Sequence, residues 1–442
     1  MLNFLGLLAP IFFVVVLLEW YLGRRKGKEV FQFSDAVANM CAGMAERMFD
    51  FFWAIIMLFA FKWIYDNFAI FNIPRTVWTW ILCLLAYDFL YYWYHRLGHE
   101  ANFLWAIHIV HHQSEEYNYT VASRQSGFQA IAKTFFIAPL PLIGFAPEFA
   151  WTVFIAAGVH QFFLHTRLIG RLGFLEYIFV TPSLHRVHHG RNEEYLDKNY
   201  GGVFIFWDML YGTYEREEAE VRYGITSGFN SRNVYWSYFH YWVDLFKQAR
   251  VIPKWKDKIA LFLQHPGWLP EDVKPKEAPK PKPLDRPKYE PKAPAQLTVY
   301  ILLQVFICLV LLAGMMIQKG DVKNGYSSLE AFYMEYMTPW EVAAYAALIT
   351  MATLTIPVLV EKRKWVYYAE QLRLVLMAIG VPFILLELSV GNPWGSLIAG
   401  GFFACSAWLF RMRRFFSNDL SELNKPDKEK QDGDGVKQLA LS

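Results

Sequence analysis

The sequence predicts an all-α, polytopic membrane protein with about nine transmembrane helices and a histidine-rich metal site on the cytoplasmic side. Two observations predict this fold class. Hydrophobic residues make up 55% of the 442 residues, aromatic residues 18% and charged residues only 19%, and the mean hydropathy is +0.18. Eight of the 12 histidines fall in three short clusters beside apolar segments. Such a composition is typical of a membrane scaffold, and such clusters are typical of a metal site.

The net charge and the cysteines exclude other classes. A formal net charge of +3 is near neutral, and we expect no nucleic-acid partner. The four cysteines lie far apart in apolar stretches and form neither a CxxC pair nor a disulfide framework. We therefore expect Cys41, Cys83, Cys308 and Cys405 to be small buried hydrophobic residues.

The first half of the chain contains five candidate spans, at residues 2–22, 44–64, 77–94, 127–142 and 147–168. No basic residue precedes the first span, and four follow it within residues 24–28. This pattern predicts an uncleaved anchor with its N-terminus outside and its basic cluster in the cytoplasm. The fourth span is short, so the fourth and fifth form either a full hairpin or a shallow re-entrant pair.

The second half begins with a linker. Residues 269–296 are rich in proline and lysine, which predicts an extended segment without a core of its own. The linker separates a catalytic region, residues 1–268, from a second bundle, residues 297–416. That bundle has spans near 297–317, 339–360, 369–390 and 394–411, and a polar tail predicted to be disordered follows at 417–442. Nine crossings place every basic cluster and the C-terminus in the cytoplasm.

The three histidine clusters predict the metal site. Residues four apart share one face of a helix, so His95 and His99 project together from the cytoplasmic end of the third span. The HIVHH and HRVHH boxes repeat a tight spacing, and neutral imidazole is a ligand for iron, zinc or copper. The eight candidate ligands are His95, His99, His108, His111, His112, His185, His188 and His189. One tetrahedral zinc takes four ligands, so eight predict two metals, about 3.5–4 Å apart by analogy.

Other residues near the boxes have candidate roles. His165 lies at the cytoplasmic end of the fifth span and is a candidate ninth ligand, whereas His160 lies a turn deeper. Asp88 shares a helix face with His95 and His99, and a metal-bound histidine usually donates its second N–H to a carboxylate or carbonyl. Asp88 is therefore a candidate partner, with simple packing as an equal alternative. Asn199 is a similar candidate, with turn formation as the alternative.

The position of the clusters indicates lipid oxidation. A metal transporter would place its ligands near the bilayer midplane, and a zinc protease would carry HExxH, which HRLGHE is not. A metal site at the membrane face can receive a lipid chain that rises from the bilayer. Histidine-held iron with O₂ can cleave an unactivated C–H bond, which no side chain does unaided.

The motifs resemble a known family. HRLGH, HIVHH and HRVHH are similar to the HxxxH, HxxHH and HxxHH boxes of the membrane-bound fatty acid hydroxylase/sterol desaturase superfamily. The longer strings YDFLYYWYHRLGHE, HHQSEEYNYTVASRQS and TPSLHRVHHGRNEEYLDKNYGG look more like the alkylglycerol monooxygenase family within it. These motifs cover residues 87–212, and the nine-span layout is also similar.

The resemblance implies a chemistry. It implies a non-haem diiron centre held by the eight histidines, in which zinc can replace iron in purified protein. It also implies that the enzyme uses O₂ and tetrahydrobiopterin. It implies hydroxylation of the ether-linked carbon of an alkylglycerol, followed by collapse of the hemiacetal to fatty aldehyde and glycerol. By the same resemblance, Glu100 matches the acidic residue that follows the first box in the family and is a candidate catalytic residue. His165 matches a histidine that the family has later in the chain. Leu184 stands where some relatives have another histidine.

Three polar residues and two alternative functions complete the prediction. On this reading Asn118, Arg124 and Gln125 contact the glycerol end of the substrate, with ordinary loop hydrogen bonding as the alternative. The rival enzyme is a fatty acyl or sterol hydroxylase or desaturase that takes electrons from a protein redox partner. The other alternative is a metal transporter or a metal-sensing scaffold.

Overall fold

The computed structural model describes residues 2–274, 283–316 and 338–416. Within these residues the protein is all-helical, as predicted, and the only β-structure is an isolated antiparallel bridge between Phe179 and Phe204. The first bundle consists of α1 (Leu2–Arg25), α2 (Phe33–Phe68), α3 (Val77–Glu100), α6 (Gln129–Ile137), α7 (Pro139–Ile143) and α8 (Pro147–Leu164). The second bundle consists of α13 (Ala295–Met316), α15 (Pro339–Thr355), α16 (Lys364–Gly380) and α17 (Pro393–Arg411).

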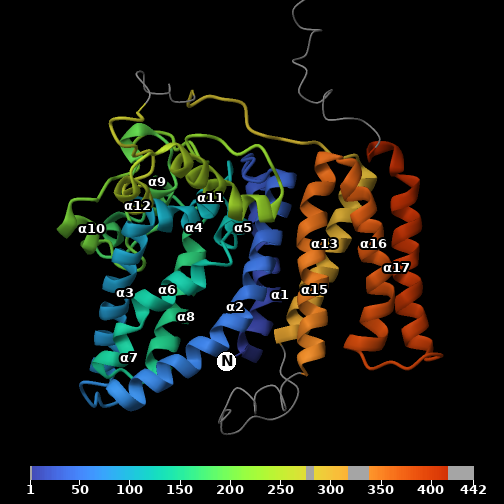
Figure 1. Cartoon of the computed structure of the whole chain (residues 1–442), viewed down its shortest axis with the longest axis horizontal. Coiled ribbons are helices and arrows are strands. Elements are labelled where there is room, and N and C mark those ends of the chain that lie inside the picture. Colours follow the sequence, from blue (N-terminus) through green and yellow to red (C-terminus); the bar gives the residue numbers. More distant parts are fainter. Residues whose placement is uncertain (1, 275–282, 317–337, 417–442) are drawn as a thin grey trace, which may run out of the picture.

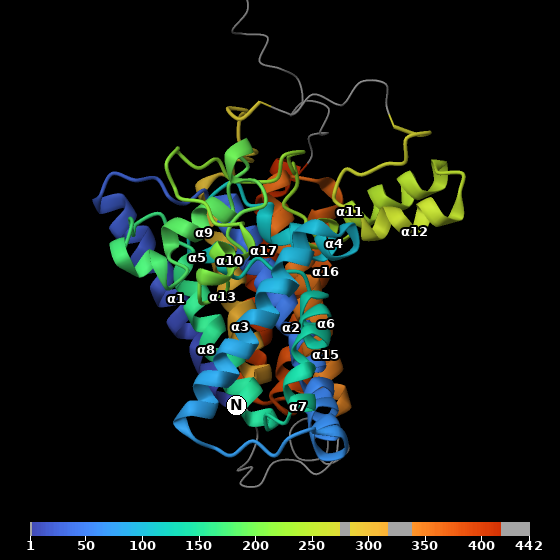
Figure 2. The same ribbon diagram turned by 90° about the vertical axis from the view of Figure 1, so that its left-hand side faces the viewer.

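Six further helices of the described chain gather at one end of the first bundle (Figure 1). We call this part, residues 101–128 and 165–268, the cap. Its helices are α4 (Asn102–His112), α5 (Tyr119–Ala122), α9 (Pro182–His188), α10 (Phe206–Tyr211), α11 (Val234–Val251) and α12 (Trp255–Leu263). Short 3-10 or π turns are η1 (Gly173–Tyr177), η2 (Glu193–Tyr195), η3 (Ile356–Glu361), η4 (Val381–Leu385) and η5 (Arg413–Phe416). In Figure 2, α11 and α12 extend sideways, across the direction of the long helices, an orientation that suits helices lying in a membrane interface.

Helix α2 extends well beyond its predicted span of residues 44–64. At 36 residues it is roughly 54 Å long, more than the hydrocarbon thickness of a bilayer, and it runs obliquely through the molecule (Figure 1). Its first turns lie against the cap, where Asp35 forms a buried ion pair with Arg232 at 2.6 Å. The Gln32 side chain caps the helix by accepting the Asp35 N–H. The polar start of α2 therefore joins the first bundle to the cap.

Five helical segments in the described part of the chain are long and apolar enough to cross a membrane: Phe33–Phe68, Ala295–Met315, Pro339–Glu361, Lys364–Leu385 and Pro393–Arg411. Four of them match the predicted spans of the second bundle, so the protein is a multi-pass membrane protein. Helix α3 carries tyrosine, tryptophan and histidine, and α8 carries tryptophan and histidine, which lower their hydropathy. The total of nine crossings stays a prediction.

Helices α6, α7 and α8 together run down the length of the first bundle and back. Helices α6 and α7 descend from the cap, and α8 returns to it (Figure 1). At the far end, the N–H groups of Ile70 and Phe71, in the α2–α3 connection, donate to the carbonyls of Leu142 and Ile143 at 2.9 and 3.0 Å. The two segments therefore form a helical hairpin as long as the first bundle, and the prediction that both cross the membrane stays a prediction.

The described part of the linker crosses the cap on its way to the second bundle (Figure 1). We call residues 283–294 the strap; they contain no helix. The Arg286 guanidinium donates to the carbonyls of Ile225 and Thr226 at 2.7 and 3.0 Å. The Tyr289 N–H donates to Glu115 at 2.7 Å, and Lys288 pairs with Glu116. The strap thus contacts the cap through hydrogen bonds with charged partners and through an ion pair.

Two further predictions concern the cysteines and the tail. All four cysteines are free and buried, as predicted. The predicted disordered tail, residues 417–442, lies outside the described residues, as do residues 275–282 of the linker and the end of the span predicted at 297–317. The extent of the domains stays a prediction.

Candidate metal centre

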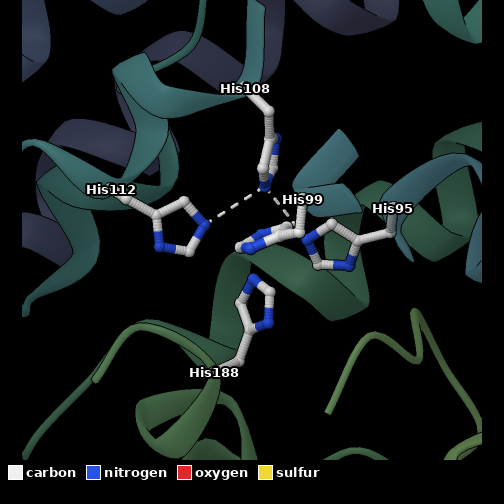
Figure 3. A group of neighbouring side chains, drawn as sticks. All are labelled: His95, His99, His108, His112 and His188. Atoms are coloured by element: carbon white, nitrogen blue, oxygen red, sulfur yellow. Dashed lines mark hydrogen bonds between the residues drawn. The ribbon is translucent and has the colours of Figure 1, made fainter. Parts of the chain in front are cut away.

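Nine histidines converge between the ends of α3, α4, α8 and α9. They form two groups in which one ring nitrogen of each residue lies within 4.8 Å of those of all the others. The first group is His95, His99, His108, His112 and His188; the second is His111, His165, His185 and His189. Figure 3 shows the five rings of the first group turned toward a common centre. The two groups adjoin, because the rings of His112 and His189 stack with centroids 4.4 Å apart.

Helix periodicity explains how the boxes divide. Each box gives one pair of histidines four residues apart to a single group: His95 with His99, His108 with His112, and His185 with His189. The remaining histidine of the second and third boxes, His111 or His188, joins the opposite group. A helix rotates by about 100° per residue, so neighbours such as His111 and His112 face in different directions. Helices α4 and α9 therefore each supply both groups.

Backbone carbonyls fix the orientation of four rings. The Nδ1 atoms of His95 and His165 lie 2.8 Å from the carbonyl oxygens of Tyr200 and Gln161. Those of His111 and His188 lie 3.1 and 3.0 Å from the carbonyls of Arg124 and Lys198. A carbonyl only accepts, so in each pair Nδ1 carries the hydrogen and the lone pair of the neutral ring is on Nε2. This arrangement is typical of metal-bound histidine.

The Nε2 atoms of several of these rings lie close to one another. His108 Nε2 lies 3.1 Å from Nε2 of both His95 and His112, and His165 Nε2 lies 3.2 Å from Nε2 of both His111 and His185. Ligand nitrogens at about 2.1 Å from one metal are roughly 3.0–3.4 Å apart. Among the described residues, Nε2 of His99, His188 and His189 is buried and has no hydrogen-bond partner. The donor set therefore fits metal ions.

Burial keeps these imidazoles neutral. Loss of hydration disfavours the charged ring and lowers the pKa of His188 from 6.5 to about 4. The same cause holds the pKa of the other α4 and α9 box histidines well below the usual range: His108, His111, His112, His185 and His189. Neutral imidazole is the form that binds a metal.

Two buried carboxylates hold the loop that orients His95. Asp88 accepts from the N–H groups of Val203 and Phe204 at 2.7 and 2.9 Å, and from the Trp207 indole at 3.1 Å. Asp208 accepts from the Tyr200 N–H at 2.7 Å. Asp88 thus acts on His95 through the backbone of this loop rather than by direct contact.

Glycines allow that close approach. A Cβ at Gly202 would lie 2.8 Å from Asp88 Oδ1 and 2.6 Å from Tyr91, and one at Gly201 would lie 2.6 Å from the Phe204 carbonyl. The Gly-Gly pair is therefore required for the loop to reach α3.

A strained turn orients His188. Asp197 and Asn199 both have left-handed backbones, with φ of 58° and 57°, and they flank Lys198, whose carbonyl faces His188. The Asn199 amide donates to the carbonyls of Leu184 and Glu215 at 3.0 and 2.7 Å. Asn199 thus fixes this turn, which matches its predicted turn role and also supports a ligand histidine.

The three candidate glycerol contacts have different environments. Asn118 is buried; it donates to the Val30 carbonyl at 2.7 Å and caps α5. Arg124 is buried and donates to Asn39, Val110 and Gln113. Both hold the cap together. Gln125 differs, because its Oε1 atom is buried and has no partner among the described residues.

Glu100 and His160 lie outside both groups. Glu100, at the end of α3, pairs with Arg96 at 2.8 Å, and its side chain is 26% exposed. The half-buried His160 ring lies 3.2 Å from the Val180 carbonyl. This position agrees with the sequence analysis, which chose His165 and not His160 as the candidate ninth ligand.

Aromatic residues complete the centre, and the sequence alone gave no reason to select them. The Trp105 ring lies 4.9 Å from that of His99 and 5.6 Å from that of His112. Tyr117 is buried, stacks on His165 at 5.5 Å and donates to the Leu164 carbonyl. Their position in the sequence offers one indication, since Trp105 and Tyr117 both lie within five residues of a histidine box. In a chain with 18% aromatic residues, that proximity does not discriminate.

Comparison with known proteins identifies the chain. The family model described as "Fatty acid hydroxylase" matches residues 80–213. "Alkylglycerol monooxygenase" of Homo sapiens is 39% identical over 268 residues, which is 59% of this chain and 59% of that protein. The protein of the same name from Danio rerio is 34% identical over 380 residues, 84% of this chain and 80% of that protein. The one from Xenopus tropicalis is 33% identical over 309 residues, 69% of each. No solved structure matches the chain significantly.

The multi-pass helical fold, the two histidine groups and these matches define a membrane-bound lipid hydroxylase or monooxygenase. Within that class, the chain belongs to the alkylglycerol monooxygenase family, because it covers 80% of a 34% identical member.

Proposed function

We propose that this protein is an O₂-dependent diiron monooxygenase that cleaves the ether bond of alkylglycerols. One oxygen atom enters a C–H bond at the ether carbon, and the other leaves as water with two electrons and two protons from a reductant. The resulting hemiacetal loses the glycerol oxygen and gives a fatty aldehyde and glycerol. The observation that carries the proposal is the pair of adjoining histidine groups in a member of this family.

The fit of the groups supports two metals. Five and four imidazoles, all buried, leave Nε2 lone pairs directed at two centres. Bound iron would supply oxygen activation, which no side chain provides unaided. The chain's own residues hold the rings neutral and oriented, and exclude water by burial. Tyr117 packs on the second group, and Glu100, paired with Arg96, is proposed to move protons at the edge of the site.

The orientation in the membrane follows from the basic residues. Arg24 and Arg25 at the end of α1, Lys362 to Lys364 at the start of α16, and Arg411 at the end of α17 lie at the same end of the molecule as the histidines (Figure 1). The positive-inside rule places this end in the cytoplasm. We infer that the N-terminus is outside and that the histidine groups and the C-terminus are cytoplasmic.

The test is an aldehyde assay on purified, iron-loaded protein with an alkylglycerol and O₂, with and without tetrahydrobiopterin. We expect trapped fatty aldehyde that depends on O₂ and pterin. His111→Ala should abolish it, whereas His160→Ala, outside both groups, should retain it. A hydroxylated or unsaturated lipid with an intact backbone would replace this proposal with the rival hydroxylase or desaturase.

A further inference from the structure

A cavity of about 450 Å³ opens between the cap and the connection that follows α1. One wall is formed by residues 28–30, and the other by residues of the segments 167–170 and 217–223 together with Arg186. We call this cavity the α1 pocket. No histidine is among the described residues that line it, so a ligand in it is separate from the metal centre.

The α1 pocket lies at the level of the membrane face. Arg24 and Arg25 end α1 and mark its inferred cytoplasmic boundary. Their guanidinium groups lie 5.2 and 5.5 Å from the ring centroids of Trp20 and Tyr21, and such aromatic residues prefer the membrane interface. In Figure 2 the end of α1 is level with α11 and α12, which lie across the long helices. The pocket therefore opens at the depth of lipid headgroups.

An apolar loop borders the α1 pocket. Residues 169–178 follow α8, and Ile169, at the start of this loop, lines the pocket. Five large side chains of the loop are exposed, and Phe174 is 72% exposed: Ile169, Leu172, Phe174, Tyr177 and Ile178. Large apolar side chains exposed together mark a surface that contacts a partner or a membrane. At the membrane face, they are placed to lie among acyl chains.

Most charged groups of the lining already have partners. Arg186 donates to both Glu217 carboxylate oxygens at 2.7 and 2.6 Å, and its third nitrogen donates to two carbonyls. Glu220 pairs with Arg222 at 2.9 Å. Lys28 and Glu29 are different, because both are exposed and neither side chain has a charged partner in the described part of the chain. The pocket therefore offers one free positive and one free negative charge.

Arg167 adds a donor beside these two charges. One of its terminal nitrogens donates to the Glu29 carbonyl at 2.9 Å and to Glu116 at 2.5 Å. Its Nε atom is buried and has no acceptor among the described residues. Burial of a donor without an acceptor is unfavourable, and a phosphate oxygen would supply the acceptor through a charge-assisted hydrogen bond.

We propose that the α1 pocket binds the zwitterionic headgroup of a membrane phospholipid of the phosphatidylethanolamine class. Its phosphate lies at Lys28 and Arg167, and its ammonium group lies at Glu29. The volume falls within the 300–1,000 Å³ of small-ligand sites, so the pocket holds the headgroup while the acyl chains extend along the apolar loop. A headgroup with negative charge alone would leave Glu29 facing a like charge, which disfavours it. The inference is independent of the oxidation chemistry, because lipid binding needs neither metal nor O₂.

The test titrates the full-length protein in detergent with phosphatidylethanolamine, phosphatidylglycerol and soluble phosphoethanolamine. Native mass spectrometry measures the bound lipid, and circular dichroism confirms the fold of each variant. We expect one phosphatidylethanolamine to bind in preference to the other two compounds. Lys28→Gln should weaken its binding about 5-fold, the effect of one basic residue at a lipid surface. Lys26→Gln, exposed two residues away and outside the pocket, is the matched control and should bind as wild type.

A second variant separates a zwitterionic headgroup from an anionic one. Glu29→Gln should weaken the binding of phosphatidylethanolamine, because the ammonium group loses its partner. Tighter binding of phosphatidylglycerol than of phosphatidylethanolamine, strengthened further by Glu29→Gln, would show an anion site and overturn the proposal. Unchanged binding in both pocket variants would also overturn it, as would soluble phosphoethanolamine that binds as tightly as the lipid. The aldehyde assay has no part in these outcomes, so ether cleavage and the lipid site stand or fall separately.

Discussion

Two clusters of buried polar side chains in the described part of the chain, one in each half, differ in how their atoms are partnered. In the second bundle, Glu370 and Arg373 are fully buried and pair at 2.5 Å. Tyr300 and Thr355 donate to the two Glu370 oxygens at 2.5 and 2.6 Å, and Arg373 also donates to Gln304 at 2.6 Å. Only the Gln304 Nε2 atom lacks a partner in the described part of this cluster.

The histidine centre is the opposite case. It has nine buried rings, and Nε2 of His99, His188 and His189 has no partner among the described residues. Buried polar atoms in native proteins are nearly always satisfied, so a concentration of unpartnered lone pairs indicates an external ligand. A cluster that satisfies itself stabilises helix packing. The comparison thus assigns chemistry to the first half and a structural role to the charges of the second.

The largest expected effect comes from removing one ligand from each group. His188→Ala in the first group and His185→Ala in the second should each lower the metal content from two toward one ion per chain. Activity should fall by more than about 100-fold, since even groups that support a ligand contribute 10–100-fold. Mass spectrometry of bound metal and the aldehyde assay measure the two effects, with His160→Ala as control. Two metals retained in both variants would contradict the assignment.

The convergence of the box histidines was largely predictable, whereas the group that each histidine joins was not. Residues four apart share a helix face, so the pairs His95 with His99, His108 with His112 and His185 with His189 follow from local geometry. Helix periodicity also turns His111 away from His112, but which group each one joins depends on where α4 lies relative to α8 and α9, which sequence spacing does not encode. The carbonyl partners are unpredictable for the same reason: Tyr200 lies 105 residues from His95.

Polar residues beside the boxes illustrate a second limit. Asn118 and Arg124 have the residue types that would bind glycerol, but in the structure they join the cap to the N-terminal segment and α2. Residue type gives the hydrogen-bonding capacity of a side chain, and tertiary packing selects the partner. The proline-rich linker shows the same limit: its extended form follows from composition, but its ionic contacts with Glu115 and Glu116 do not.

The next prediction concerns the cluster of Glu370 and Arg373 in the second bundle. Arg373→Met leaves the Glu370 charge buried without its partner, which should cost about 3–5 kcal/mol. Thermal unfolding in detergent should record the loss, while the folded fraction keeps its full metal content. Adding Glu370→Gln should restore much of the stability, because the uncompensated charge is gone. Loss of metal from folded Arg373→Met would instead couple the second bundle to the chemistry and break the comparison.

The smallest effect concerns the strap, which joins the two halves. Arg286→Ala removes two bonds from a charged donor to the Ile225 and Thr226 carbonyls, for an expected local cost of about 1–3 kcal/mol. Because these carbonyls belong to a loop that lines the cavity beside His99 and His112, hydrogen exchange should rise in residues 222–230 and not in the long helices. Lys292→Ala, exposed on the same segment, should leave exchange unchanged. Equal exchange in both variants would mean that the strap only connects the halves and does not hold the cap.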